Sequence, residues 1–186
     1  MVSTAKESAQ KALCEIRQGF MTALAGAACL RSSGDLDCLT AAGRSRDFVI
    51  VNRDGKGIGF PLDSIRRALL EDRPRILRGF LKVSIRSAVR ESYEVLKSYC
   101  KNTDQYRDAM KAQAWFDFYR LLRDALSHDA IWRFDPRDKR KLPITWNGFT
   151  ITSDLDGTPL TFEELDLEVI FSLLRDAERF LAEDLQ

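Results

Sequence analysis

Apolar residues recur at steps of three and four along much of this 186-residue sequence, which is the spacing of one face of an α-helix. The pattern is clearest over residues 5–31, and Thr4 and Glu7 at its start have the spacing of a helix capping box. We therefore predict a long amphipathic helix there, whose buried face carries Leu13, Ile16, Phe20, Leu24 and Ala27.

The same periodicity returns four more times and predicts helices over residues 62–72, 74–100, 104–127 and 162–183. Pro74 separates the first two, because proline cannot donate the backbone hydrogen bond of a helix interior. Thr161 and Glu164 again have capping-box spacing. The expected core positions of the second and third long helices are Ile76, Phe80, Val83, Ala88, Val89, Leu96 and Tyr99, then Trp115, Phe118, Leu122 and Ala125.

Two short segments favour β-structure instead. Residues 32–60 contain five glycines and an apolar run at 48–51 before Asp54-Gly55, which indicates a loop holding a small hairpin. Residues 143–152 place Asn147-Gly148 between two β-prone triplets, a strong signal for a two-residue hairpin turn. We therefore expect a mainly α protein: one domain over residues 1–186, a helical bundle with a β-hairpin inserted before its last helix.

Composition narrows the possible partners. The formal net charge is only +1, from 29 basic and 28 acidic residues, so any anionic partner must be held by a local patch. The apolar stretch 20–30 is shorter than the ~20 residues of a membrane span, and residues 1–10 do not resemble a signal peptide. We expect a cytoplasmic protein without a membrane partner. The four cysteines lack metal-site spacing, so we expect buried free thiols, no metal and no cofactor.

The only histidine, His128, stands at the end of the segment Leu121-Leu122-Arg123-Asp124-Ala125-Leu126-Ser127-His128. An imidazole can accept or donate a proton near neutral pH, and a guanidinium suits phosphate oxygens. Cleavage of an RNA phosphodiester needs both, because the 2′-hydroxyl loses a proton, the leaving 5′-oxygen gains one and the phosphorane is negatively charged. An ordinary helix-end histidine, favoured by the helix dipole, is the alternative.

This segment resembles the signature of the HEPN family: an arginine, a polar residue, three to five further residues and a histidine, near the end of a long helix. Arg123 matches the arginine, Asp124 the polar position and His128 the histidine. The resemblance in architecture covers residues 62–185, and the specific motif spans residues 123–128. Asp124 departs from the asparagine that is frequent in the family.

The resemblance implies a HEPN-like four- or five-helix bundle and a metal-independent endoribonuclease that leaves a 2′,3′-cyclic phosphate. It further implies a homodimer whose two motifs share one composite cleft, a role as a toxin or antiviral defence effector, and an antitoxin or regulatory protein as a partner. Some HEPN domains are not catalytic, so a module that only binds RNA or protein is the alternative function. Arg123, His128 and Asp124 are the expected catalytic residues, with Asp124 placed to orient the imidazole.

Arg123 and His128 are five residues apart, which is roughly 140° around a straight helix. The helix must therefore end or distort by Ser127, or a second subunit must bring the two groups together. Around this pair we expect RNA contacts from Trp132 and Phe134 by base stacking, unless these rings are core residues. Further expected RNA contacts are Arg120, Ser127, Arg137, Lys139, Arg140 and Lys141. Ion pairs of Arg120 with Asp117 and Asp124, and a merely solvated basic loop, are the alternatives.

Overall fold

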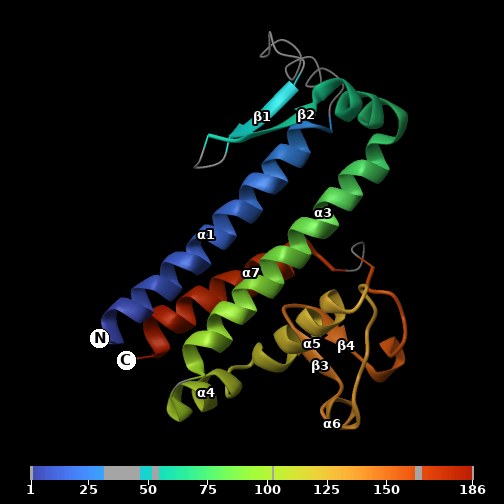
Figure 1. Cartoon of the computed structure of the whole chain (residues 1–186). Coiled ribbons are helices and arrows are strands. Elements are labelled where there is room, and N and C mark those ends of the chain that lie inside the picture. Colours follow the sequence, from blue (N-terminus) through green and yellow to red (C-terminus); the bar gives the residue numbers. More distant parts are fainter. Residues whose placement is uncertain (1, 32–46, 52–54, 102, 162–164, 186) are drawn as a thin grey trace. The chain divides into compact units, whose positions relative to one another are not determined.

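The computed structural model describes residues 2–31, 47–51, 55–101, 103–161 and 165–185, and these are mostly helical (Figure 1). The predicted mainly α fold, with a hairpin before the last helix, is confirmed. The helices are α1 (Val2–Cys29), α3 (Leu62–Cys100), α4 (Asp104–Lys111), α5 (Phe116–Ser127), α6 (Pro136–Lys139) and α7 (Leu167–Arg179), the last continued by the π-helical stretch η2 (Phe180–Asp184). The strands are β1 (Asp47–Val51), β2 (Gly57–Pro61), β3 (Ile144–Trp146) and β4 (Phe149–Ile151).

The chain divides into two compact units. The larger unit comprises Met1–Phe20 and Ser84–Gln186, and the smaller comprises Met21–Val83. α1 and α3 each contribute to both units, because the division falls inside these helices. The expected motif, the later hairpin and the last helix all belong to the larger unit. That the whole chain acts as a single domain stays a prediction.

The beginning of α1 runs antiparallel to α7 and η2 in the larger unit (Figure 1). Lys6 Nζ donates to the Leu185 carbonyl at 2.6 Å, and Arg17 pairs with Glu178 at 2.7 Å. Phe20 meets Phe171 with ring centroids 5.3 Å apart. The predicted helix at 5–31 is confirmed, but it begins at Val2, so Thr4 lies inside it and is not its N-cap.

α3 joins the two helices that we predicted on either side of Pro74. Asp72 interrupts it with φ −152° and ψ 67°, and the Asp72 carboxylate accepts a hydrogen bond from the backbone N–H of Arg75. Asp72 thus acts as the N-cap of the longer part, with proline in its first turn. Ala88, Val89 and Leu96 are buried as expected, whereas Phe80 and Val83 are exposed. Beyond the interruption at Asp72 the buried stripe begins at Ile85, and residues 80 and 83 point away from that direction on a helix.

The predicted single helix over residues 104–127 is wrong: residues 112–115 break it into α4 and α5. The reason is packing. Met110 and Trp115 are both buried, yet residues five apart would face directions roughly 140° different on one continuous helix. Trp115 inserts edge-on between Tyr119 and Phe180. The predicted buried stripe of α5 is confirmed at Trp115, Phe118, Leu122 and Ala125.

The predicted hairpin is β3 and β4, which pair antiparallel with Trp146 opposite Phe149. Asn147 and Gly148 have φ of 43° and 83°, as a two-residue hairpin turn with matching twist requires. The Phe149 ring meets Phe118 of α5 edge-on. The hairpin thus packs on the helix that carries the HEPN-like segment.

The smaller unit holds the second predicted hairpin, in which β1 and β2 pair antiparallel. Gly55 lies between them with φ 75°. Residues 32–46 and 52–54, including Asp54 and Cys38, lie outside the described residues. Cys100 is a buried thiol as expected, but Cys14 is only partly buried and Cys29 is exposed.

The last helix begins later than its sequence predicts. α7 starts at Leu167, and its N-cap is Asp166, whose carboxylate accepts from the Glu168 N–H at 3.0 Å. Thr161, the predicted cap, has a buried hydroxyl with no hydrogen-bond partner among the described residues, and Glu164 lies outside them. None of the described helices combines the length and the apolar character that crossing a bilayer requires.

Candidate functional site at the end of α5

His128 terminates α5. Its backbone N–H still bonds to the carbonyls of Asp124 and Ala125, each at 3.2 Å, but its φ of −116° and ψ of 67° leave the helix. Asp129 and Ala130 follow with φ of 60° and 57°, in the left-handed region that L-residues rarely adopt. The expected end of the helix by Ser127 is thus confirmed.

Beyond His128, the backbone is fixed by hydrogen bonds to residues 158–160. The Ala130 carbonyl accepts from the Leu160 N–H at 2.7 Å, and Trp132 N–H donates to Thr158 at 3.0 Å. An isolated antiparallel bridge joins Ile131 to Pro159. His128 therefore lies in a short turn between a helix and this bridge. Its side chain is exposed, and within the described residues the imidazole makes no hydrogen bond or ion pair.

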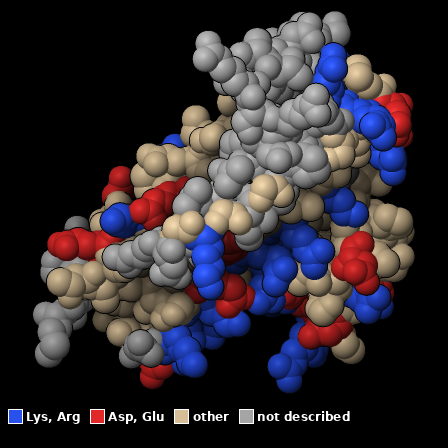
Figure 2. All heavy atoms as spheres, turned by 45° about the horizontal axis from the view of Figure 1, so that its top comes forward, with Lys and Arg blue, Asp and Glu red and all other residues tan. Residues whose placement is uncertain are grey.

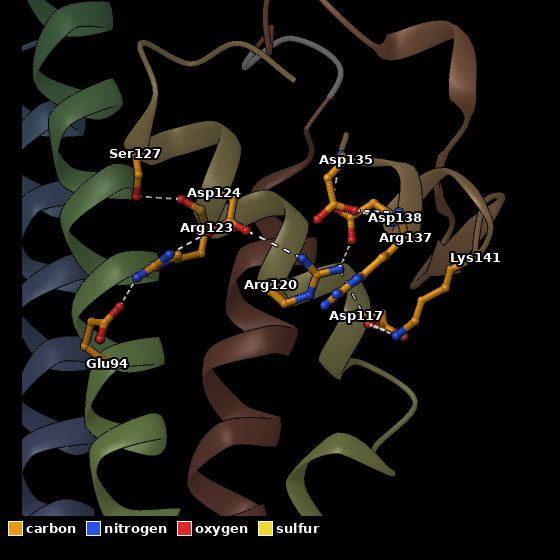
Figure 3. Close-up of polar contacts among 10 residues, drawn as sticks. All are labelled: Glu94, Asp117, Arg120, Arg123, Asp124, Ser127, Asp135, Arg137, Asp138 and Lys141. Atoms are coloured by element: carbon orange, nitrogen blue, oxygen red, sulfur yellow. Dashed lines mark hydrogen bonds and ion pairs between the residues drawn. The ribbon is translucent and has the colours of Figure 1, made fainter. Parts of the chain in front are cut away.

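Arg123, five residues before His128, is fixed between α5 and α3 (Figure 3). It donates to the Asp124 carboxylate at 2.6 Å and to the Glu94 carboxylate of α3. Its guanidinium carbon lies 5.3 Å from the centroid of the Tyr93 ring. Burial opposes the charge of Arg123, but its hydrogen bonds to Asp124 and Glu94 prevail and raise its pKa. The same site raises the pKa of Tyr93 to about 12, through burial first and the Asp124 charge second.

Arg120 points the other way, toward α6 (Figure 3). It pairs with the buried Asp138, and it also lies 3.6 Å from Asp124 and 3.8 Å from Asp117. Burial opposes its charge, but the Asp138 hydrogen bond and the surrounding carboxylates raise its pKa. The expected alternative of ion pairs with Asp117 and Asp124 is confirmed. Contact of Arg120 with RNA stays a prediction, and it would require an anion to compete with three carboxylates.

Asp124 differs from its expected role. Its carboxylate contacts Arg123 at 2.6 Å and Arg120 at 3.6 Å, and no hydrogen bond joins it to the His128 side chain. Ser127 is also engaged locally, because its hydroxyl donates to the Arg123 carbonyl at 2.8 Å. Asp124 therefore holds the arginines of α5 and does not orient the imidazole.

The basic loop after His128 contains the short helix α6. Asp135 and Asp138 form a capping box around its start. Lys139 pairs with Asp156 at 2.6 Å, and Lys141 pairs with Asp117 at 2.8 Å. Of the four cations at residues 137–141, two form no ion pair with a carboxylate within the described residues: Arg137, which is exposed, and Arg140, whose Nε donates to the Pro136 carbonyl at 3.2 Å. The loop thus presents two available charges, where the sequence suggested four.

Trp132 and Phe134 do not form a base-stacking platform. Trp132 is 1% exposed and Phe134 is 7% exposed. The Trp132 ring lies 6.0 Å from Phe134 and 6.4 Å from Phe149 of the hairpin, centroid to centroid. The core alternative is confirmed for both rings, since both are buried and Phe149 of the hairpin packs against Trp132.

The ion pair between Lys139 and Asp156 links the α6 loop to the turn after the hairpin. We predict that its contribution to the stability of the fold is lost in acid. The Lys139 hydrogen bond, and second a hydrogen bond from the Phe134 N–H, lower the pKa of Asp156 below its ordinary 3.8. Between the lowered pKa of the folded protein and the ordinary pKa of the unfolded chain, the unfolded chain binds more protons. The stability that the Asp156 carboxylate contributes is therefore complete above the ordinary pKa, and it is lost as the pH falls through the lowered pKa. We expect Asp156→Asn to be less stable at pH 7 and to lose less stability between pH 7 and 3 in urea unfolding.

The control for this measurement is Asp154→Asn. Asp154 is an exposed carboxylate in the same short turn (Ser153–Leu155), and it forms no ion pair or hydrogen bond within the described chain. This variant should follow the wild-type pH dependence. Equal pH dependence of all three proteins would show that the Asp156 contacts do not stabilise the fold.

Residues of α3 complete the surroundings of the site, and we did not predict them. Glu94 and Tyr93 contact Arg123, and Arg86 Nη2 lies 3.4 Å from the Ser127 carbonyl at the end of α5. A signal was present, because basic residues recur every fourth position at 78, 82, 86 and 90. Nothing in the sequence, however, pairs that face with α5.

The wider surface agrees with the near-neutral total charge, since acidic and basic groups are interspersed over the face drawn in Figure 2. Within the described residues, no group of three or more His, Cys, Asp or Glu side chains is placed to hold a metal ion. No protein-family model, no curated protein and no solved structure matches this chain.

Proposed function

We propose that this protein is a metal-independent endoribonuclease of the HEPN class. The observation that carries the proposal is the combination, on one helix end, of two groups: an exposed imidazole that has no polar partner among the described residues, and a fixed guanidinium five residues earlier. His128 would exchange protons with the RNA, and Arg123 would contact the phosphate. The resemblance of residues 123–128 to the HEPN signature supplies the reaction type.

In the proposed reaction a ribose 2′-oxygen attacks the adjacent phosphorus after losing its proton. The bond from phosphorus to the 5′-oxygen then breaks, and that oxygen takes a proton. The products are a 2′,3′-cyclic phosphate and a free 5′-hydroxyl, and no water is consumed. The imidazole serves the proton transfers, and the guanidinium stabilises the charge of the phosphorane.

Arg123 has donors to spare for a phosphate. A guanidinium carries five N–H donors, and the bonds to Asp124 and Glu94 account for two of them. Its Nε is buried and has no hydrogen-bond partner in the described part of the chain, and 26% of the side chain is exposed. An RNA phosphate can therefore approach the terminal nitrogens while the carboxylates hold the arginine in place.

The test is incubation of the purified protein with single-stranded RNA in EDTA. We expect cleavage to proceed under chelation and to leave 2′,3′-cyclic phosphate ends, detected by mass spectrometry. DNA of the same sequence is the control and should stay intact, because it lacks the attacking hydroxyl. Intact RNA, equal cleavage of DNA, or cleavage that requires added metal would each refute the proposal.

The charge compensation of the two arginines favours a second candidate, a HEPN module that binds RNA or protein without catalysis. Arg120 and Arg123 together contact four carboxylates, those of Glu94, Asp117, Asp124 and Asp138. RNA bound but left uncut would favour this candidate. The homodimer with a composite cleft, the role as a toxin or defence effector and the antitoxin or regulatory partner are further proposals that the resemblance implies.

A further inference from the structure

The basic face of α3 borders the helix end that carries the proposed site. Arg86 reaches the Ser127 carbonyl at the end of α5, and Glu94, two turns later, pairs with Arg123. Arg90 stands midway, four residues from each, so it lies on the same face of α3. Arg90 is therefore placed beside α5, between the two points at which α3 contacts it.

Arg90 is an available cation in this position. It is exposed, and it forms no ion pair or hydrogen bond within the described chain. The acid next to it in sequence, Glu91, is engaged by the Ser87 hydroxyl. Arg86 uses one of its five donors on the Ser127 carbonyl. The two arginines thus retain most of their hydrogen-bonding capacity, unlike Arg120, Lys139 and Lys141, which contact carboxylates.

We propose that Arg86 and Arg90 bind backbone phosphates of single-stranded RNA next to the one held at Arg123. This inference rests on the proposed function for the identity of the ligand. Planar guanidinium groups on successive helical turns suit the phosphates of an extended strand, and such contacts position a strand without reading its bases. The α3 face then supplies the local positive patch that a chain of net charge +1 needs in order to bind an anion.

The experiment measures binding of a short, labelled 2′-O-methyl RNA, which lacks the attacking hydroxyl and cannot be cleaved by the proposed route. Arg90→Ala and Arg86→Ala should each weaken binding roughly tenfold at low salt. Each should also reduce the slope of log affinity against log salt by about 0.7, the value for one lost contact to a single strand. Arg86→Lys, which keeps the charge, should retain most of the binding and so guards against a folding defect in Arg86→Ala.

The matched control is Lys101→Ala, which removes one exposed positive charge just beyond the far end of α3, about 16 Å along the helix axis from Arg90. It should bind as the wild type does. Wild-type affinity in both Arg86→Ala and Arg90→Ala would overturn the inference, even if unmodified RNA is cleaved. Weakened binding in both would uphold it even if unmodified RNA stays intact, in which case only the nuclease proposal fails. A wild-type protein that binds no RNA would overturn both.

Discussion

Replacing His128 with alanine is expected to slow RNA cleavage by about 10²–10⁴-fold, the range that general acid–base catalysis contributes. The imidazole is the proton-transferring group of the proposed reaction, and no other histidine exists in the chain to replace it. The change should scarcely affect the fold, because the side chain is exposed and makes no polar contact within the described residues. A substitution of that kind usually alters stability by no more than about 0.5 kcal/mol.

The measurement is the single-turnover cleavage rate in EDTA, with thermal unfolding recorded for the same samples. Arg133→Ala is a suitable control, since Arg133 is an exposed charge five residues further on and forms no ion pair in the described structure. It should cleave at nearly the wild-type rate. Cleavage by His128→Ala at the wild-type rate would remove the imidazole from the mechanism and with it the basis of the nuclease proposal.

Trp132→Ala is expected to lower the free energy of unfolding by about 3–5 kcal/mol, as deletion of a large buried aromatic side chain does. The ring is 1% exposed and packs against Phe134 and Phe149. Its loss would open a cavity beside Phe134 and Phe149, which the surrounding backbone can close only in part. The consequence is a destabilised larger unit and no specific loss of RNA contacts.

Urea unfolding followed by circular dichroism gives this free energy. Trp132→Phe is the matched control, because it keeps an aromatic ring in the same space and should lose much less stability. Both variants should bind RNA like the wild type under conditions where they stay folded. Full stability of Trp132→Ala combined with weakened RNA binding would instead support the base-stacking role that burial argues against.

Local patterns predicted most of the elements correctly. The amphipathic stripe of α1 and the Asn147-Gly148 turn depend on residues near one another in sequence, so they can be inferred from the chain alone. The break between α4 and α5 could not be inferred, because residues 112–115 include no helix breaker. It arises from the burial of both Met110 and Trp115, which is a property of the packed core.

In the candidate site, too, local sequence predicted some features, while others depend on the packing of distant residues. The HEPN-like segment and its position at a helix end followed from the sequence, and α5 ends at Ser127, which is one of the two ways in which the pair was expected to come together. The carboxylates around the arginines did not follow from it. Glu94 reaches Arg123 from 29 residues away, and Asp138 reaches Arg120 from 18 residues away. Such partners depend on how α3 and α6 pack against α5, which no local spacing specifies.

The turn at His128 has a consequence for the energetics of substrate binding. Its backbone is fixed on one side by α5 and on the other by the bridge between Ile131 and Pro159. Only the rotation of the imidazole about its own two side-chain bonds is left to be ordered, so preorganisation keeps the entropic cost of the reactive geometry small. The α6 loop lies beyond that bridge. Insertions within this loop should therefore change how an RNA strand is bound without displacing the His128 imidazole.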